Sequence, residues 1–386
     1  MRLALVHDYL SQDGGAEHVL RVMQEIWPEA PTFVLFYDAG RANPAFRDKS
    51  IKSSFLHRVP LARFRYQWFL PLMPKAIEAL DLGDYDIIIS SSSSFAKGII
   101  TRASALHISY CHTPTRYLWG DTYNYIEELP HNRLVKAIVP LFLTNLRLWD
   151  RLAAERPQKM IANSRAVQER IKKYYNRESD VIYPPVFVDQ FYISPKQENF
   201  FLAGGRLVGY KRFDLIVQAF NKLKMPLKIF GIGPKFDELR RLSSPNIEFL
   251  GRISDEVKKE LCSKCLAFIH PQEEDFGLTA VEAMSSGRPV IAWPRGGALE
   301  TVIPGKTGIF LDEQSWEELA GQIINFKPEN FDPAQIREHA RAFDAGRFKN
   351  ELGEYVEKSW QEFTKGTNYE HAANIRTFNL SKHSLP

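Results

Sequence analysis

The sequence predicts an α/β protein made of two doubly wound domains, each with a parallel sheet covered by helices on both faces. Two observations support this. Short apolar runs alternate with helical stretches along the chain, and the alternation restarts near residue 190. Such alternation is typical of βαβ units, whose parallel strands are buried on both faces. The length of 386 residues agrees, because a single core rarely grows beyond about 250 to 300 residues.

Each half of the chain contains six apolar runs that end at small, polar or proline residues. This pattern is typical of a buried strand that stops at a loop. Most of the intervals between the runs have helical spacing. The predicted strands are 3–9, 32–37, 85–93, 106–112, 159–164 and 180–185 in the first half, and 200–205, 227–233, 247–251, 266–271, 288–294 and 308–311 in the second.

The domain boundary is expected in the polar stretch around residue 190, close to Pro195. Residues 1–190 then form an N-terminal domain and residues 191–345 a C-terminal domain. Residues 346–365 are expected to form a helix that packs back on the N-terminal domain, and residues 366–386 a poorly ordered polar tail. Ligands of doubly wound sheets bind at the carboxyl ends of the strands, so we expect a ligand in the cleft between two facing domains.

The composition is that of a soluble globular protein, with 44% hydrophobic and 25% charged residues. The net charge is only +4, and we expect no nucleic-acid partner. The best candidate for a membrane span, residues 137–149, is interrupted by Pro140, Asn145 and Arg147, so no span is expected. The first residues lack a signal-peptide pattern, and the three cysteines are too few for a disulfide framework. Both features favour a cytoplasmic location.

Basic and aromatic residues are concentrated between Arg41 and Lys75, where eight Lys or Arg accompany a single acid, Asp48. This composition is typical of a segment that lies against an anionic membrane surface or an acidic ligand. A solvated loop and helix with snorkelling cations explains it equally well. The candidate contact residues are Arg58, Arg63, Arg65 and Trp68.

The strongest candidate site follows the predicted strand 266–271. Residues 270–284 read HPQEEDFGLTAVEAM, which predicts the end of a strand, a loop and then a helix. Glu274 would lie in the loop and Glu282 about two turns into the helix, with the free N–H groups of the helix between them. A phosphate can bind such N–H groups while the carboxylates accept hydrogen bonds from diols. A sugar nucleotide offers all of these groups.

Two cations follow the first predicted strand of the same domain. Arg206 and Lys211 stand at the carboxyl end of strand 200–205 and at the head of the next helix, where two fixed cations can clamp a pyrophosphate. The alternative is that both are exposed loop residues. Because they share a sheet edge with the Glu274 loop, we favour a role in ligand binding.

The N-terminal domain offers weaker candidates. Gly14 and Gly15 lead from the first strand into a helix, where the backbone can approach a phosphate or sugar, although a simple turn explains them too. His112 ends a strand and could donate to a sugar hydroxyl, although a lone histidine is more often structural. Asp84 and Asp86 form a DxD pair but precede a strand, at the wrong end of the sheet, so no metal is expected.

Taken together, these motifs resemble the family 4 retaining glycosyltransferases, which have the GT-B fold of two facing Rossmann-like domains. The likeness rests on residues 273–292, EEDFGLTAVEAMSSGRPVIA, and on GGALETVIPGKTGIFL after them. GGAEHVL, YDIIISSSSSFAKG, YCHTPTRYLW and GRLVGYKRFD are similar to the branch of bacterial O-antigen mannosyltransferases, which use GDP-mannose. Gly209 and Gln272 depart from the expected proline and small residue.

The resemblance implies a role for each candidate residue. Arg206 and Lys211 match the pyrophosphate clamp, Glu274 the residue that holds the donor sugar's hydroxyls, and Glu282 the residue that holds the ribose diol. The amides of Phe276, Gly277 and Leu278 match the loop at the sugar and phosphate. His112 matches the N-terminal, acceptor-side residue near the transferred sugar, and Gly14 and Gly15 the loop that closes on the phosphate side.

The resemblance also implies an activity. The expected reaction moves a hexose, mannose from GDP-mannose, to a lipid-linked glycan with retention at the anomeric carbon. It would require no metal or other cofactor and would serve cell-surface polysaccharide synthesis at the inner face of the membrane. The alternatives are a UDP-sugar donor, a sugar-nucleotide epimerase of the same fold, and a nucleotide-sugar-binding protein without turnover. The loop from Glu274 to Glu282 argues against the epimerase.

Overall fold

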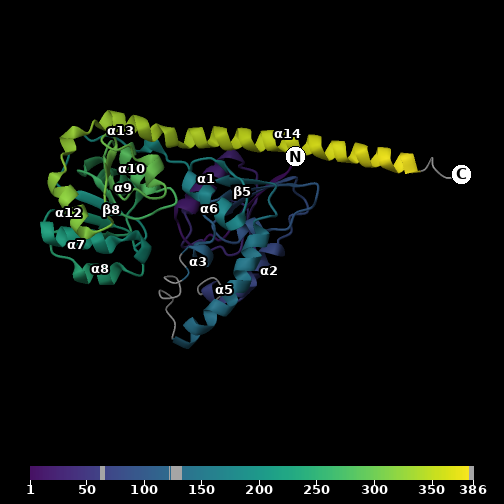
Figure 1. Cartoon of the computed structure of the whole chain (residues 1–386), viewed down its shortest axis with the longest axis horizontal. Helices are drawn as coiled ribbons and strands as arrows, with labels where there is room; N and C mark the ends of the chain where they lie inside the picture. The colour runs from purple at the N-terminus through teal and green to yellow at the C-terminus, as the bar shows by residue number, and fades with distance from the viewer. Residues whose placement is uncertain (61–65, 121, 123–132, 382–386) are drawn as a thin grey trace. The chain divides into compact units, whose positions relative to one another are not determined.

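The computed structural model describes residues 1–60, 66–120, 122 and 133–381, and the chain forms two compact units. Unit 1 consists of Met1–Ala162, Gln168–Ile182 and Lys349–Pro386, and unit 2 of Asn163–Val167 and Tyr183–Phe348. Each unit contains one sheet in which the paired strands are parallel, and helices cover both faces (Figure 1). The predicted α/β class with two doubly wound sheets is confirmed.

The sheet of unit 1 has seven strands in the order β3-β2-β1-β4-β5-β6-β7. The order reverses between β1 and β4, so loops that follow these two strands meet at the switch point of the sheet. The strands are β1 (Leu3–His7), β2 (Thr32–Val34), β3 (Ile51–Ser53), β4 (Ile87–Ser92), β5 (Leu106–Cys111), β6 (Lys159–Ala162) and β7 (Asp180–Val181).

Helices α2 and α5 cover one face of this sheet, and their apolar residues share a core cluster with those of β1 and β4. The other face carries α1 and α6, with α14 alongside (Figure 1). Helix α14 is tied to α1 by the ion pair between Lys349 and Glu25, 2.7 Å apart, and to β7 by Tyr355. The helices are α1 (Gly15–Ile26), α2 (Met73–Glu78), α3 (Arg116–Trp119), α5 (Arg133–Ala153), α6 (Arg165–Tyr175) and α14 (Ala345–Ser381).

The sheet of unit 2 has six strands in the order β10-β9-β8-β11-β12-β13. Its two faces hold separate core clusters, one with α7, α8 and α12 and one with α9, α10 and α13 (Figure 1). The strands are β8 (Phe201–Gly204), β9 (Leu227–Phe230), β10 (Ile247–Gly251), β11 (Phe268–His270), β12 (Val290–Ala292) and β13 (Gly308–Phe310). The helices are α7 (Phe213–Leu223), α8 (Phe236–Leu242), α9 (Asp255–Lys264), α10 (Leu278–Ser285), α11 (Ala298–Thr301), α12 (Trp316–Asn325) and α13 (Pro333–Ala340).

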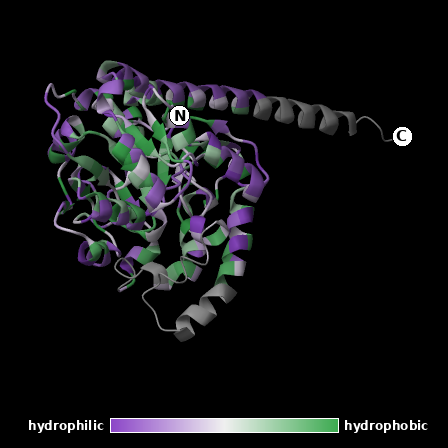
Figure 2. Cartoon of the chain, turned by 60° about the vertical axis from the view of Figure 1, so that its left-hand side comes forward, coloured by the Kyte–Doolittle hydropathy of each residue, from purple (hydrophilic) through white to green (hydrophobic). Residues whose placement is uncertain are grey.

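The hydrophobic pattern explains why these helices pack as they do. In α7, Phe213, Ile216, Val217 and Phe220 recur at helical spacing and are all buried against the sheet. Full burial of each such side chain stabilises the fold by about 1.5 to 3 kcal/mol relative to exposure. Figure 2 shows the same arrangement, with hydrophobic strands inside and hydrophilic residues on the outer helices.

Two features differ from the expectation. Residues 183–191 belong to unit 2 because Val186, Val188 and Phe191 are part of its core, whereas the sequence predicts a boundary near residue 190. Helix α14 continues to Ser381, past the predicted start of the tail, and no proline interrupts it. Among the helices that the structure describes, none has the length and apolar character needed to cross a bilayer.

Candidate active site

The carboxyl edge of the unit 2 sheet brings two predicted site residues together. Strands β8 and β11 are neighbours, so the loops that follow them meet. Lys211 ends a short 3-10 turn after β8, and Glu274 lies in the loop after β11. The Lys211 ammonium lies 2.7 Å from Oε1 of the Glu274 carboxylate. The two residues therefore form an ion pair at the expected place.

This pair is open to solvent on one side, since 13% of the Lys211 side chain and 15% of the Glu274 side chain are exposed. Gly205 makes room for the lysine: its φ is +134°, and a Cβ there would lie 3.1 Å from the Lys211 Nζ. Arg206 is exposed, and no described residue accepts a hydrogen bond from its guanidinium. Two cations thus stand at this edge, one paired and one available.

The loop from residue 271 to residue 277 presents backbone N–H groups beside the ion pair. Gly277 has φ +89°, and helix α10 begins at the next residue, Leu278. No described residue accepts a hydrogen bond from the amides of Phe276, Gly277 or Leu278. The Phe276 ring anchors the loop because it is buried against Tyr183. Free amides at a helix start attract anions.

Gly296 and Gly297 contact the backbone of this loop. The Gly297 N–H donates to the Glu274 carbonyl oxygen at 2.9 Å, and Gly296 forms an isolated bridge with the same residue. A Cβ on Gly296 would lie 2.1 Å from the Glu274 carbonyl oxygen. The backbone of Glu274 is therefore held by a contact that requires glycine.

Glu282 lies about one turn into α10, which corrects the expectation of two turns. The helix starts late because Gly277 adopts a left-handed conformation before it. The Glu282 carboxylate accepts a hydrogen bond from the Lys258 ammonium of α9 at 2.8 Å. Although burial opposes it, this carboxylate raises the pKa of Lys258 above its ordinary value. Glu282 thus pairs with Lys258, separately from the Lys211–Glu274 pair.

His270, at the end of β11, lies under the same loop. Burial lowers its pKa to about 4, so the ring is neutral near pH 7. Its Nδ1 pairs with the Gln272 Nε2 at 3.0 Å, and its Nε2 has no hydrogen-bond partner among the described residues. A Cβ on Gly277 would lie 3.0 Å from this Nε2. The glycine therefore lets the loop close over the histidine.

The carboxyl edge of the unit 1 sheet holds the other predicted residues. His112 follows β5, and its Nε2 lies 2.7 Å from the Ser91 Oγ of β4. Burial is the main cause that lowers the pKa of His112 to about 3, so its ring is neutral. Gly14 and Gly15 precede and begin α1, and the Gly14 N–H donates to the Glu17 carboxylate at 3.0 Å.

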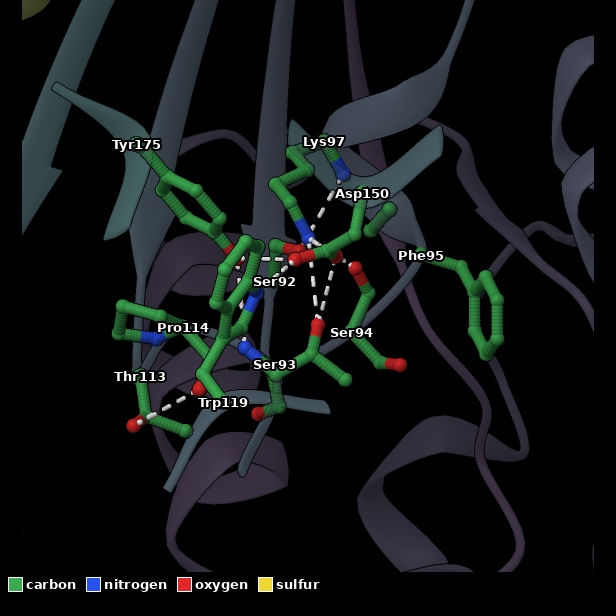
Figure 3. A network of polar contacts seen from close by, with 12 residues as sticks. Ser92, Ser93, Ser94, Phe95, Lys97, Thr113, Pro114, Trp119, Asp150 and Tyr175 are labelled. Carbon is green, nitrogen blue, oxygen red and sulfur yellow. Dashed lines mark hydrogen bonds and ion pairs between the residues drawn. The ribbon is translucent and has the colours of Figure 1, made fainter. Parts of the chain in front are cut away.

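A buried polar network supports the loops after β4 and β5 (Figure 3). Lys97 and Asp150, each with 1% of its side chain exposed, form an ion pair at 2.5 Å. The Asp150 carboxylate also accepts hydrogen bonds from Thr115, Trp119 and Tyr175 at 2.7, 2.7 and 2.9 Å. Burial first, and then the Asp150 carboxylate, raise the pKa of Tyr175. This network fixes the loop that follows His112.

The basic aromatic segment is described only in part. Arg58 is exposed at the end of a 3-10 turn, and 55% of Trp68 is exposed. Phe55 and Leu72 of the same segment are also exposed, at 45% and 47%. The other two predicted contact residues, Arg63 and Arg65, lie outside the described residues. The described part therefore exposes Arg58 and further Lys and Arg side chains, together with these three large apolar side chains.

The DxD pair precedes β4, as expected. The Asp86 carboxylate accepts a hydrogen bond from the Arg2 N–H at 2.8 Å and forms an ion pair with Arg102 at 2.6 Å. Bonding to the Arg2 backbone is the main cause that lowers the pKa of Asp86. Asp86 thus has a structural role at the amino edge of the sheet.

Comparison with known proteins identifies the family. The model for Glycosyltransferase Family 4 matches residues 13–190, and the model for Glycosyl transferases group 1 matches residues 188–343. The Anabaena protein Alr3699/HepE, solved with UDP and glucose, has a TM-score of 0.69 at 19% identity over 92% of this chain and 99% of that chain. Sucrose-phosphate synthase from Thermosynechococcus elongatus has a TM-score of 0.71 at 18% identity over 94% of this chain and 100% of that one. The chain belongs to the GT-B glycosyltransferases of group 1 and family 4.

Three curated relatives share between 25% and 28% identity with this chain. The alpha-1,3/1,6-mannosyltransferase ALG2 of Dictyostelium discoideum is 25% identical over 69% of this chain and 73% of its own length. The O-antigen chain mannosyltransferase C of Escherichia coli is 27% identical over 48% of both chains. An uncharacterised glycosyltransferase of Methanocaldococcus jannaschii is 28% identical over 51% of this chain and 58% of its own length. The matches with the last two thus span about half of those relatives.

Several residues at these two edges were missed by sequence reasoning. Gly296 and Gly297 were noted only as part of a family motif, although their spacing after strand 288–294 could have placed them at the same edge. Lys258 and Asp150 lie on helices, where a charged residue predicts only a solvated face. Their contacts depend on which helices become neighbours.

Proposed function

We propose that this protein is a retaining, metal-independent glycosyltransferase that moves mannose from GDP-mannose to a hydroxyl of a glycan acceptor. The observation that carries the proposal is the Lys211–Glu274 ion pair beside the unpaired amides of residues 276–278. Lys211, the exposed Arg206 and these amides can bind a diphosphate. Glu274 can then accept hydrogen bonds from the sugar hydroxyls, and Glu282 from the ribose diol.

The proposed reaction uses these groups mainly as the glycosidic bond breaks. The bond between the anomeric carbon and the diphosphate oxygen breaks while the acceptor oxygen bonds to the same face of that carbon. The acceptor's proton passes to the leaving phosphate. Negative charge grows on the diphosphate, and Lys211, Arg206 and the amides would stabilise it in the transition state.

The choice of mannose is supported by the mannosyltransferases among the relatives. The choice of GDP rests on the resemblance of the sequence motifs to the O-antigen mannosyltransferase branch. A UDP-sugar donor is the second candidate, because a protein of the same fold was solved with UDP-glucose at a TM-score of 0.69. Diphosphate, ribose and hexose are common to both donors. The Glu274–Lys211 pair and the Glu282–Lys258 pair therefore fit a GDP-sugar and a UDP-sugar equally well.

Thermal shifts test this proposal first. The purified protein is heated with GDP, UDP, ADP and their hexose conjugates, because a ligand that binds only the folded state raises its melting temperature. We expect a shift selective for GDP and GDP-mannose, lost in Lys211→Ala and kept in Lys264→Ala. Lys264 is a matched control because it ends α9 at the opposite edge of the sheet. A shift selective for UDP would mean that the donor is a UDP-sugar instead. The absence of a shift with every nucleotide would refute the proposed binding site.

Product analysis separates transfer from its alternatives. GDP-mannose labelled in the sugar is incubated with lipid-linked glycans from a bacterial membrane extract, and the label is followed into lipid. An epimerase would release free nucleotide and an altered free sugar. A binding protein without turnover would give the thermal shift but no labelled product.

The acceptor is proposed to be lipid-linked, with the protein at the inner face of the membrane. Arg58, Trp68 and the exposed apolar side chains of the same segment support this. Co-sedimentation with vesicles of anionic or neutral phospholipid tests it at low and high salt. We expect binding to anionic vesicles that salt and the Arg58→Ser, Trp68→Ser double variant weaken. Equal binding by the variant would remove the support.

A further inference from the structure

A buried row of polar side chains crosses the carboxyl edge of the unit 1 sheet. It runs from Glu17 of α1 through His7 of β1 and Ser91 of β4 to His112 after β5. Their exposed fractions are 2%, 2%, 0% and 7% in that order. Glu17, His7 and Ser91 carry no role in the proposed reaction, yet Ser91 contacts His112 directly and His7 and Glu17 continue the row behind it.

The strand order makes this row continuous. Strands β1, β4 and β5 are consecutive in the sheet, and His7 is the register partner of Ser91. His7 Nδ1 lies 3.1 Å from the Ser91 carbonyl oxygen and 3.0 Å from the Ser91 Oγ. Ser91 Oγ in turn lies 2.7 Å from the His112 Nε2. The serine hydroxyl thus stands between two imidazole rings.

Counting protons along the row gives the tautomer of His112. A carbonyl oxygen only accepts hydrogen bonds, so His7 Nδ1 carries a proton that it donates to Ser91. The Ser91 hydroxyl then accepts from His7, and its own proton has His112 Nε2 as the acceptor among the described residues. Because His7 Nδ1 is already protonated, the reverse arrangement would leave the buried Ser91 hydroxyl proton without an acceptor. His112 Nε2 is therefore the acceptor, and Nδ1 carries the ring proton.

This tautomer leaves His112 with one available donor. Nδ1 has no hydrogen-bond partner among the described residues, while 7% of the residue is exposed. Burial, followed by the nearby His7, lowers the pKa of His112 to about 3, so the ring stays neutral near pH 7. A neutral donor suits a sugar oxygen, which can accept this hydrogen bond without gaining a proton.

The same row also holds the loop at Gly14. The Glu17 carboxylate accepts from the Gly14 N–H at 3.0 Å and from the Gln12 side chain at 3.1 Å, and its Oε1 lies 3.8 Å from His7 Nε2. The loop that was predicted to close on the phosphate side and the histidine that was predicted to lie near the sugar are therefore joined by a chain of buried and partly buried contacts.

We propose that Ser91 is a positioning residue that fixes His112 in the Nδ1–H tautomer, so that Nδ1 donates a hydrogen bond to a sugar oxygen of the substrate. The proposal deepens the proposed glycosyltransferase function and rests on it for the identity of the substrate. The tautomer itself can be measured without any substrate, so the two proposals can fail separately.

Nitrogen NMR of the full chain labelled with ¹⁵N-histidine tests the tautomer. Protonated and unprotonated ring nitrogens have well-separated shifts, and the His112 signals are those lost in His112→Gln. We expect a protonated Nδ1 and an unprotonated Nε2 in the wild type at pH 7. In Ser91→Ala the Nε2 loses its donor, and we expect the protonated form of Nε2 to become populated. A wild-type ring protonated at Nε2 would overturn the proposal, whatever the variants do.

Ser90→Ala is a matched control. Ser90 is the adjacent residue of β4, is also fully buried, and pairs with His107 Nε2 at 2.8 Å on the other side of the strand. It removes the same kind of serine–histidine contact without touching His112. We expect it to change the His107 signals and to leave the His112 signals unchanged.

Kinetics test the functional half. With the donor found by thermal shift, Ser91→Ala should lower kcat about 10- to 100-fold, by analogy with the loss of the outer hydrogen-bond partners of metal-ligating histidines, with little change in KM. Ser91→Thr, which keeps the hydroxyl, should restore most of the activity, and Ser90→Ala should keep it. A wild-type kcat in Ser91→Ala would overturn the positioning role. Absence of transfer by the wild type would overturn the proposed function, while the NMR result would still decide the tautomer.

Discussion

Each unit contains a lysine–carboxylate pair with almost the same separation but different surroundings. Lys97 and Asp150 lie 2.5 Å apart in unit 1 with 1% of each side chain exposed. Lys211 and Glu274 lie 2.7 Å apart in unit 2 with 13% and 15% exposed. In the first pair, Asp150 accepts from three further donors. The second pair stands beside unpaired amides and the exposed Arg206.

The difference indicates which pair can exchange its partner. A buried pair whose oxygens are all bonded has one arrangement, and removal of either member leaves an uncompensated charge. A pair that solvent still reaches can separate when an anion or a diol replaces one member. An ion pair is therefore informative about function only together with the groups around it.

The largest expected effect is on stability, and it concerns the buried Lys97–Asp150 pair. Asp150→Ala should lower the free energy of unfolding by about 3 to 5 kcal/mol, because it leaves Lys97 charged and buried. Glu274→Gln should cost clearly less, because the amide keeps a polar group beside Lys211 and solvent reaches this pair. Urea unfolding of both variants measures this. Equal losses would mean that the two pairs do not differ as described.

The next effect is on turnover, and it concerns the partly exposed Lys211–Glu274 pair. Lys211→Ala should lower kcat at least about 100-fold, the loss typical of removing one donor to a developing negative charge. Its melting temperature should stay near that of the wild type. Lys264→Ala changes the charge equally at the opposite edge and should keep full activity. Normal turnover by Lys211→Ala would exclude the clamp.

Low pH should lower the stability of unit 1 more than that of unit 2. Burial lowers the pKa of His107 and His112 in unit 1 to about 3 and that of His270 in unit 2 to about 4. The unfolded chain binds these protons at a higher pH, near 6.5, so stability is complete above that pH and falls as the pH drops toward 3 to 4. One such histidine can contribute a slope of up to about 1.4 kcal/mol per pH unit.

Hydrogen exchange of peptides from each unit at pH 7 and pH 5, corrected for intrinsic rates, measures this difference. We expect the protection of unit 1 to fall more. His107→Gln should flatten the acid dependence of unit 1, since it removes one titrating group. Equal falls in both units would contradict the assignment of two such histidines to unit 1.

The smallest effect concerns the backbone of the open site. Gly277→Ala should cost about 1 to 2 kcal/mol because φ is +89° there, and its Cβ would also crowd His270. The matched control is Gly321→Ala in helix α12, where a Cβ meets no atom within 4 Å. This control should stabilise the protein by up to about 1 kcal/mol. Thermal unfolding of both variants shows whether the loop needs its left-handed residue.

The sequence was sufficient for the fold class and for one edge of the site. Alternating apolar runs predicted parallel sheets, and Lys211 and Glu274 were expected together because both follow strands of one domain. The order β1-β4-β5, which makes neighbours of His7, Ser91 and His112, cannot be read from periodicity. Asp150 was missed for a similar reason, since its partners Lys97 and Trp119 come from other segments.

Glu282 shows that the start of a predicted helix is harder to predict than the helix itself. Its helix was predicted correctly, but its distance from the helix start was not, because the left-handed Gly277 shifts that start. A hydrophobic pattern gives the type of an element more reliably than its ends. The Glu282–Lys258 contact also depends on the packing of α9 against α10.

The long helix α14 has a consequence for how the chain folds during its synthesis. It completes unit 1, where Lys159 pairs with Glu362 and Tyr355 donates to Asp180, but it is made after all of unit 2. At about 5 to 20 residues per second, the ribosome needs roughly ten to thirty seconds for residues 183–348. During that interval unit 1 lacks its last helix, whereas unit 2 can fold as soon as it leaves the ribosome.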